Sequence, residues 1–378
     1  MKKLSYGMVG GGPGSFIGDA HRKSINIDAG AVLTAGCFSR SIDKCRETGA
    51  QLGIAEDRCY ASFEEMAKAE AARPAGIDFA VVVTPNVSHY AACKAFLEAG
   101  INVSCDKPLC LTVEQADELV ALAKEKGVLV LVTYTYMGHV TAKHIKRFIA
   151  EGKLGKVRTV MAEYPQGWLA YEGEWGGKQG EWRCDPAQSG GVNCLGDLGT
   201  HVENAVATMT GLKIKRVMAK MDVVVPGRVL DDNDVVMVEY EGGATGCYWT
   251  SQFAIGHKND LRVRIYGEKG SILWEQENCE KVTMIEYDGT EVIRYRGTPG
   301  IEPGAAAYGR LPSGHTEGWL ESMGNLYKSF INCINAKKDG TFTPDMIDFP
   351  TVEDGAEGVK FVHACLKSNA EGNVWVDL

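Results

Sequence analysis

The chain has 378 residues, of which 45% are hydrophobic and 24% are charged, and its formal net charge is −9. This composition is typical of a soluble globular protein, and the length predicts two domains. The sequence contains no basic stripe for nucleic acid and no apolar run long enough to span a bilayer, so neither partner is expected.

The cysteines and the first residues indicate the compartment. Twelve cysteines lie between Cys37 and Cys365, with no Cys-x-x-Cys pair and no clustering with histidines at zinc spacing. We therefore expect reduced, mostly buried thiols and no metal site. The segment from Met1 to Gly10 has no signal-peptide apolar region and resembles a strand, which predicts a cytoplasmic location.

The chain opens with the pattern of a dinucleotide-binding loop. An apolar strand at 4–9 runs into a glycine-rich turn at 10–18, and a helix is expected over 21–27. Gly10 and Gly12 fit the first two positions of Gly-x-Gly-x-x-Gly, but Ser15 holds the third, and the next glycine is Gly18. The predicted turn is therefore longer than usual, with an ordinary glycine-rich turn as the alternative. The expected cofactor contacts here are Gly10, Gly12, Phe16 and Ile17.

The second strand, 31–38, lacks the acidic residue that often holds the adenine ribose at its end. Ser39 and Arg40 stand there instead and are predicted to contact the cofactor. Arg40 could stack on adenine, meet a 2′-phosphate or be a solvated surface side chain, so NAD and NADP both remain possible.

Strands and helices alternate through residue 133, which predicts a doubly wound parallel sheet. Strands are expected at 77–84, 101–105 and 128–133, with a helix over 112–126 capped by Thr112. Ligands of such sheets bind at the carboxyl ends of the strands. The cofactor contacts expected there are Thr84, Asn86, His89, Asp106 and Lys107.

The pattern changes after residue 133 to many short strands joined by glycine-containing turns, which predicts an open, mostly antiparallel sheet with helices on one face. The expected domains are a Rossmann domain at 1–133 and an α+β domain at 134–378, and the final helix, 352–369, could pack back on the first. The expected strands are 157–164, 214–225, 234–240, 245–253, 260–266, 270–275, 281–287 and 290–296.

The run from Ser189 to His201 places Asp197 and His201 four residues apart. If the run is helical from about Asn193, both side chains lie on one face and can serve as orienter and proton acceptor. A buried polar pair or a capping arrangement is the alternative.

Two further segments suggest substrate contacts. Trp168, Trp175, Trp182 and Arg183 precede the Asp197 run, and sugar sites often combine aromatic faces with polar groups. Core or subunit-contact roles are the alternative for the tryptophans. A glycine- and proline-rich loop leads into His315, which is placed as a lid or substrate contact would be.

Taken in order, the glycine loop, Thr84-Pro85-Asn86 with His89, Asp106-Lys107-Pro108 and Gly196 to His201 resemble the Gfo/Idh/MocA oxidoreductase family. That family usually has Glu-Lys-Pro, so Asp106 is a shorter carboxylate. The resemblance implies a nicotinamide cofactor, hydride transfer at a sugar or polyol carbon, and an active site of Lys107, Asp197 and His201. It also implies a homo-oligomer formed through the open sheet.

The chemistry of these residue types agrees with an NAD(P)-dependent dehydrogenase of a sugar, polyol or glycoside. A histidine suits the base role near neutral pH, and a lysine can stabilise an alkoxide or pass the proton on. Which of the two takes the proton is left open. The alternative is an NAD-dependent glycoside hydrolase or lyase that oxidises the sugar transiently. The predicted substrate contacts are Lys107, Trp182, Arg183, Asp197, His201 and His315.

Overall fold

The computed structural model describes residues 3–171 and 177–378. The chain divides into two compact units. The first comprises Met1–Thr135 and Trp319–Ala356, and the second comprises Tyr136–Gly318 and Glu357–Leu378.

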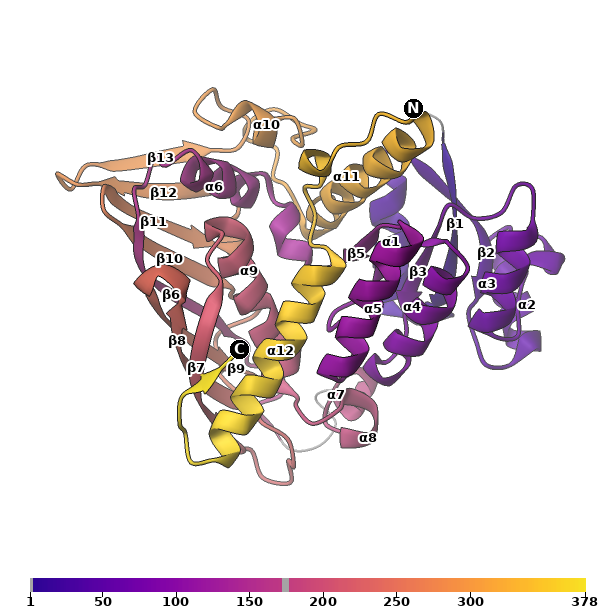
Figure 1. Ribbon diagram of the computed structural model, residues 1–378, viewed down its shortest axis with the longest axis horizontal. Coiled ribbons are helices and arrows are strands. Elements are labelled where there is room, and N and C mark those ends of the chain that lie inside the picture. The colour runs from indigo at the N-terminus through magenta and orange to yellow at the C-terminus, as the bar shows by residue number, and fades with distance from the viewer. Residues whose placement is uncertain (1–2, 172–176) are drawn as a thin grey trace. The chain divides into compact units, whose positions relative to one another are not determined.

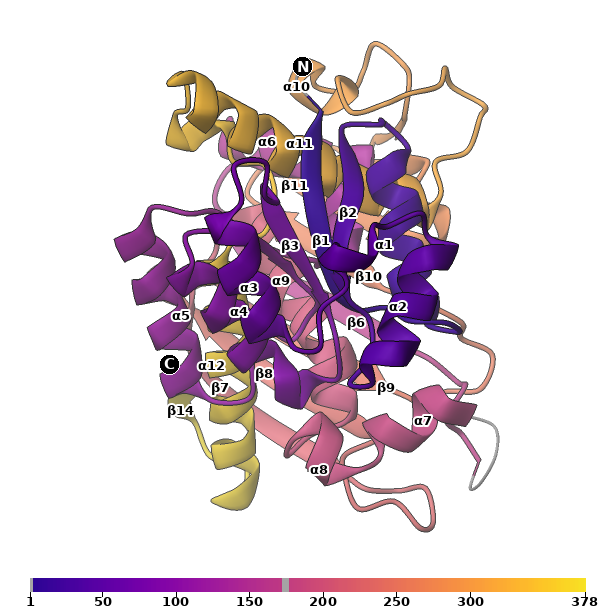
Figure 2. The same ribbon diagram turned by 90° about the vertical axis from the view of Figure 1, so that its right-hand side faces the viewer.

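The first unit contains a five-stranded sheet of order β2-β1-β3-β4-β5 in which every pair is parallel. Figure 2 shows its strands β1, β2 and β3 side by side. The predicted doubly wound parallel sheet is confirmed, and β3 is buried along its whole length, as a strand covered on both faces must be. The strands are β1 (Leu4–Gly10), β2 (Ala31–Cys37), β3 (Phe79–Val83), β4 (Asn102–Cys105) and β5 (Val130–Val132).

Side-chain caps fix where the helices of this unit begin. Thr112 caps α5, since its hydroxyl accepts from the amide of Gln115 at 3.2 Å, as the sequence predicted. The prediction that the first helix starts at residue 21 was wrong, because Ser15 caps α1 at Phe16 by accepting from the Gly18 amide. The helices are α1 (Phe16–Asn26), α2 (Ile42–Gln51), α3 (Phe63–Ala72), α4 (His89–Glu98), α5 (Val113–Lys126) and α11 (Trp319–Asp339).

Helix α11 returns to the first unit, whereas the sequence-based division placed all of 134–378 in the second domain. Its buried residues Met323, Tyr327 and Phe330 share one hydrophobic core with Tyr6 and Phe79 of the sheet. Burial of this apolar face is the physical reason for the return. The final helix α12 (Val352–Ala370) divides between the units, with its residues up to Ala356 in the first.

The second unit is built on a nine-stranded sheet of order β13-β12-β11-β10-β6-β9-β8-β7-β14. Its pairs are antiparallel except for β6 with β9, which confirms the predicted mostly antiparallel sheet. The strands are β6 (Val157–Pro165), β7 (Ile214–Asp222), β8 (Asn233–Tyr240), β9 (Thr245–Ser251), β10 (Arg262–Gly267), β11 (Gly270–Glu275), β12 (Lys281–Glu286), β13 (Glu291–Tyr295) and β14 (Val376–Asp377).

Helices cover one face of this sheet, and α6 and α9 lie over it in Figure 1. Strand β7 ends at Asp222 rather than at the predicted Val225, because the amides of Val224 and Val225 donate to the carboxylate of Asp232 instead of to a neighbouring strand. The helices of the unit are α6 (Val140–Ala150), α7 (Gly177–Arg183), α8 (Pro186–Ser189), the π-helical turn η5 (Leu195–Gly199), α9 (Thr200–Thr210) and α10 (Pro303–Ala306).

The open face of the sheet carries apolar side chains in register. Exposed residues of this face include Met161, Val235, Met237 and Ile293. One cross-strand row consists of Met218, Met237, Cys247, Met161, Arg264, Leu273, Thr283 and Ile293. Among the helices in the described part of the chain, none has both the length and the apolar character needed to cross a bilayer.

Candidate active site

The glycine loop between β1 and α1 has the close packing that a dinucleotide requires. A Cβ atom on Gly12 would lie 2.9 Å from the carbonyl oxygen of Phe38, and one on Gly18 would lie 2.4 Å from Cα of Gly11. Gly18 therefore serves as the glycine of close helix contact that Ser15 cannot supply, but the turn predicted over 10–18 was too long, because α1 already begins at Phe16. Arg22 braces the loop by donating to the carbonyl of Gly11 at 2.8 Å.

Polar and aromatic groups around the loop fit a nicotinamide dinucleotide. The hydroxyl oxygen of Thr84 is buried and has no hydrogen-bond partner, and its methyl group lies next to Gly10. The N-terminus of α1 favours negative charge such as a pyrophosphate. Phe16 is exposed and stacks on Trp319 at a centroid distance of 5.9 Å, whereas Ile17 packs against the core.

Ser39 and Arg40, which follow the end of β2, are compatible with more than one role in cofactor binding. Ser39 accepts a hydrogen bond from the amide of Ser41 at 3.2 Å, and Arg40 is exposed. Both follow the strand end next to Gly12, where the sequence predicted the adenosine half of the cofactor.

A buried network holds the turn that carries Lys107. His89 is 1% exposed, and its two ring nitrogens lie 2.7 and 2.8 Å from the carbonyl oxygens of Pro108 and Thr84. His89 thus ties the Thr84 turn, which includes the buried Asn86, to the Lys107–Pro108 turn. Both ring nitrogens of His89 contact backbone carbonyl oxygens, so His89 positions the two turns.

Asp106 is held within the same network. Its carboxylate accepts from the hydroxyl of Thr133 at 2.7 Å and lies 3.8 Å from His21, whose other ring nitrogen contacts Tyr327 of α11. Burial opposes ionisation of Asp106, but the His21 imidazole and the Thr133 hydrogen bond outweigh it and lower its pKa to about 2. The short carboxylate therefore remains ionised beside Lys107 at neutral pH.

In the second unit, the run with Asp197 and His201 is helical, as predicted, but its first turn is of π type. The amide of Asp197 donates to the carbonyl of Asn193 at 2.9 Å, and η5 leads directly into α9. Single π-helical turns occur frequently at functional sites. Asp197 is partly exposed and His201 is nearly buried.

Arg183, Gln252 and Asp197 meet in one cluster. Arg183 Nε donates to Asp197 Oδ2 at 3.0 Å, and Gln252 Nε2 donates to the same oxygen at 3.2 Å. The guanidinium lies 4.4 Å from the ring centroid of Trp182 and 5.6 Å from that of Trp168. The aromatic rings predicted to stack on a sugar therefore also support Arg183. Trp175 lies outside the described residues.

Two tyrosines flank His201. The ring centroids of Tyr136 and Tyr164 lie 4.8 and 6.0 Å from that of His201, and the two hydroxyls are hydrogen-bonded to each other and to Asn259. Burial, together with the neighbouring Tyr136 and Asp197, raises the pKa of Tyr164 well above its ordinary range. The imidazole therefore has rigid, uncharged walls on these sides.

His315 stands on an anchored loop. Its side chain is exposed, and its carbonyl oxygen accepts from Arg296, which also forms a bidentate pair with Glu280 at 2.8 and 3.0 Å. His315 Nδ1 lies 3.3 Å from the carbonyl oxygen of Pro312, and its role as a substrate contact remains a prediction.

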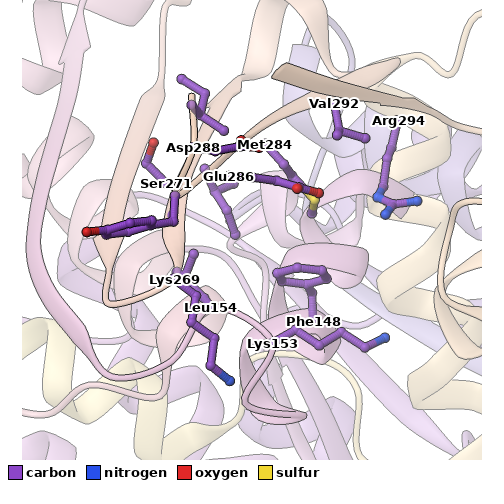
Figure 3. A pocket seen from close by; sticks show the side chains of 14 residues that line it. Phe148, Lys153, Leu154, Lys269, Ser271, Met284, Glu286, Asp288, Val292 and Arg294 are labelled. Atoms are coloured by element: carbon purple, nitrogen blue, oxygen red, sulfur yellow. The ribbon is translucent and has the colours of Figure 1, made fainter. Parts of the chain in front are cut away.

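A separate cavity of about 420 Å³ lies between the end of α6 and strands β11 to β13 (Figure 3). Phe148 and Met284 contribute apolar surface, and Lys153, Lys269 and Arg294 contribute charge. It is lined by none of the predicted site residues, so it is not the candidate active site.

Sequence reasoning missed several residues that shape the site. Tyr136, Tyr164 and Gln252 lie in segments that carry no motif, and only the fold brings them to His201 and Asp197. Asp231, whose carboxylate holds the start of the helical run, belongs to an acidic run that could have drawn attention as three acids in four residues before an apolar strand.

Comparisons with known proteins agree with both units. A family model described as an oxidoreductase family with an NAD-binding Rossmann fold matches residues 4–134, and one described as the GFO/IDH/MocA C-terminal domain matches residues 142–273. The uncharacterized oxidoreductase YfiI of Bacillus subtilis is 36% identical to this chain over 100% of this chain and 97% of its own.

Solved structures show the same agreement. A crystal structure of an inositol dehydrogenase homolog from Azotobacter vinelandii with NAD+ is 35% identical, with a TM-score of 0.95 over 100% of this chain and 98% of that chain. A structure of an inositol dehydrogenase homolog from the same organism with NADH and myo-inositol is 34% identical, with a TM-score of 0.92 over the same shares of the two chains.

Proposed function

The chain belongs to the Gfo/Idh/MocA family of NAD-binding oxidoreductases, and on that premise we propose that it is an NAD-dependent dehydrogenase of a sugar, polyol or glycoside. The observation that supports this substrate class is the cluster of Arg183, Asp197 and the tryptophan rings. Asp197 of this cluster lies four positions before His201 in the sequence. Such a group offers hydrogen bonds to hydroxyls beside aromatic faces, which suits a polyhydroxylated ring. The myo-inositol bound by the Azotobacter protein supports the same class.

Oxidation of a secondary alcohol removes hydride from carbon and a proton from oxygen. NAD, when bound, would supply the hydride acceptor. The chain itself must take the proton and stabilise the alkoxide, and we assign these tasks to Lys107 and His201. Asp197, fixed by Arg183 and Gln252, presents a carboxylate to a substrate hydroxyl or orients the imidazole.

The remaining predicted contacts follow from the same proposal. Gly10, Gly12, Thr84 and Asp106 serve the cofactor together with the start of α1, and Arg40 lies at the strand end where NAD and NADP are distinguished. Trp182, Arg183 and His315 serve the substrate, with His315 reaching it from the anchored loop.

The test is a panel of sugars, inositols and glucosides, followed at the reduced nicotinamide band with NAD+ and NADP+ separately. We expect turnover with NAD+ on at least one polyol. Failure of the whole panel with both cofactors would contradict the proposal. Product formed without accumulation of NADH would instead favour the hydrolase or lyase reading, in which the hydride returns to the sugar.

Variants then separate the roles. Lys107→Ala, His201→Asn and Asp197→Asn should each lower turnover on the substrate found. Lys269→Ala is the matched control for the lysine, because Lys269 donates to the backbone carbonyl of Gly152 outside the candidate site. Equal turnover of Lys107→Ala and wild type would remove Lys107 from the reaction.

We further propose that the protein forms a homo-oligomer through the open face of the nine-stranded sheet. In the cross-strand row from Met218 to Ile293, the apolar side chains of Met218, Met237, Cys247 and Met161 lie next to one another, and Arg264 and Thr283 interrupt the row beyond them. Exposed apolar patches of this kind mark protein interfaces, and two copies of one face satisfy the symmetry of a dimer.

A further inference from the structure

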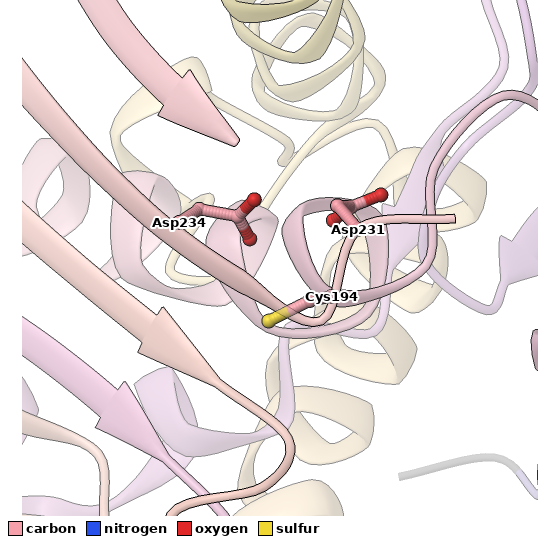
Figure 4. A group of neighbouring side chains, drawn as sticks. All are labelled: Cys194, Asp231 and Asp234. Carbon is pink, nitrogen blue, oxygen red and sulfur yellow. The ribbon is translucent and has the colours of Figure 1, made fainter. Parts of the chain in front are cut away.

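Three buried side chains, Cys194, Asp231 and Asp234, gather at the start of the helical run that carries Asp197 and His201 (Figure 4). The thiol sulfur and one oxygen of each carboxyl group lie within 4.8 Å of one another. Asp231 is 5% exposed and Asp234 is 0% exposed. Two carboxyl groups this close in a buried place cannot both be ionised at low cost, so one of them must hold a proton.

Asp231 has the surroundings of the ionised member. Its Oδ1 accepts from the amide of Asn193 at 2.7 Å, its Oδ2 accepts from the amide of Leu195 at 2.6 Å, and its carbonyl accepts from the amide of Cys194 at 3.1 Å. These are the first amides of the helical run, which have no acceptor within the helix. Amide donors and the helix dipole both favour a negative carboxylate there.

Asp234 has the surroundings of the protonated member. Its Oδ2 accepts from the hydroxyl of Thr250 at 2.9 Å, but its buried Oδ1 has no partner. Burial and the neighbouring Asp231 raise the pKa of Asp234 well above its ordinary range. Within residues 3–171 and 177–378, the other titratable groups that face the pair are the buried thiols of Cys194 and of Cys365 on α12, and neither brings positive charge.

We propose that Asp231 and Asp234 share one proton and act as a positioning pair. The protonated Asp234 donates a hydrogen bond to the ionised Asp231, and Asp231 fixes the backbone that positions Asp197. The path is short. Asp231 holds the amide of Asn193, and the carbonyl of Asn193 accepts from the amide of Asp197 at 2.9 Å. The inference rests on the proposed dehydrogenase function, in which Asp197 acts on the substrate.

The pair predicts an asymmetry between two isosteric variants. In Asp234→Asn, the amide group can donate to Asp231 as the protonated carboxyl does, so most of the turnover is retained, whereas Asp234→Ala loses that donor and turnover falls. In Asp231→Asn, one of the two acceptors of backbone amides becomes a donor. We expect kcat to fall by about tenfold or more with a smaller change in KM, since charged hydrogen bonds are strong.

The neighbouring Asp232 provides the matched control. Its carboxylate also accepts from two backbone amides, those of Val224 and Val225, but it holds a turn after β7 rather than the helical run. Asp232→Asn should therefore lower stability while kcat remains near that of wild type. A similar loss of kcat in Asp232→Asn and Asp231→Asn would mean that the loss follows from lower stability in general, and it would overturn the proposal.

Hydrogen exchange provides a readout that does not depend on turnover. The amides of Asn193, Cys194 and Leu195 should exchange at least about tenfold faster in Asp231→Asn and remain protected in Asp234→Asn. If wild type turns over no substrate, the proposed function fails, while this exchange pattern still decides the proton-sharing pair. The reverse exchange pattern would overturn the proposal, because the proton would then lie on Asp231. A stoichiometric divalent metal that is lost in Asp234→Asn would also overturn it, because a metal rather than a proton would then hold the pair.

Discussion

The Nε atom of Arg183 donates to Oδ2 of Asp197 at 3.0 Å, and the same guanidinium lies 4.4 Å from the ring centroid of Trp182. The planar guanidinium can make both contacts at once, which the compact ammonium of a lysine cannot do. The pair therefore couples the aromatic part of the cluster to the carboxylate that we assign to the substrate.

We predict that Arg183→Lys lowers kcat/KM by about 10- to 100-fold, since a hydrogen bond to a charged group contributes about 1.5–3 kcal/mol. Steady-state kinetics on the best substrate of the panel measures this. Arg216→Lys is the control, because Arg216 on strand β7 pairs with Glu239 at 2.8 and 2.9 Å and lies 4.9 Å from the ring centroid of Trp375. Equal kinetics of wild type and Arg183→Lys would remove Arg183 from the site.

Two substitutions in the glycine loop should have different effects, one on NAD+ affinity and the other on stability. In Gly12→Ala, the new methyl group would lie 2.9 Å from the backbone oxygen of Phe38, so we expect the Kd for NAD+ to rise by about tenfold, or about 1.4 kcal/mol. Gly14 has open space but a φ of 78°, so Gly14→Ala should cost about 1–2 kcal/mol of stability and leave the Kd near that of wild type. Calorimetric titration and urea unfolding measure the two. Loss of NAD+ affinity in Gly14→Ala alone would contradict this assignment.

Much of the first unit could be predicted because its signals are local. The apolar runs of β1 and β3 and the Thr112 capping box each depend on residues within a few positions of one another. The start of α1 was missed because Ser15 was assigned to the loop rather than to a cap. The return of α11 was also missed, since an amphipathic helix does not state which sheet its apolar face will cover.

The candidate site shows the same limit more sharply. The spacing of Asp197 and His201 is local and indicated a helical run, but the partners of Asp197 are not local. Gln252 lies 55 positions away, and Asp231 reaches the run only because β8 begins beside it. Hydrogen bonds of this kind depend on where strands end in space, and no period in the sequence records that.

The buried pair of His139 and Glu317 predicts a pH dependence of stability. His139 Nδ1 lies 3.0 Å from Glu317 Oε2, which also accepts from the amide of Val140. Burial alone would disfavour the charged imidazole, but the neighbouring Cys279 thiol and the Glu317 carboxylate outweigh it and raise the pKa of His139 from 6.5 to about 9. A raised folded-state pKa contributes stability that is complete below about 6.5 and is lost as pH rises through about 9.

We therefore expect the free energy of unfolding of wild type to fall between pH 7 and pH 9.5. In Glu317→Gln it should be lower by about 3 kcal/mol at pH 7, because the change leaves a buried charge without its partner, and its pH profile should be flatter. Urea unfolding at several pH values measures both. Parallel profiles of the two proteins would show that this pair does not set the dependence.

The open sheet face yields the last prediction. Met237 and Met161 are 46% and 37% exposed and lie in one cross-strand row, separated by Cys247 of β9. If two copies meet here, a stable interface buries about 1,200–2,000 Å² in total, and a glutamate at Met237, whose cross-strand neighbours Met218 and Cys247 bring no positive charge, would be desolvated without a partner. Met237→Glu with Met161→Glu should therefore give a monomer in sedimentation velocity. Val229→Glu is the control, because Val229 is 67% exposed in a loop outside the sheet. A wild-type monomer, or an oligomer that persists with both glutamates, would rule out this face as the interface.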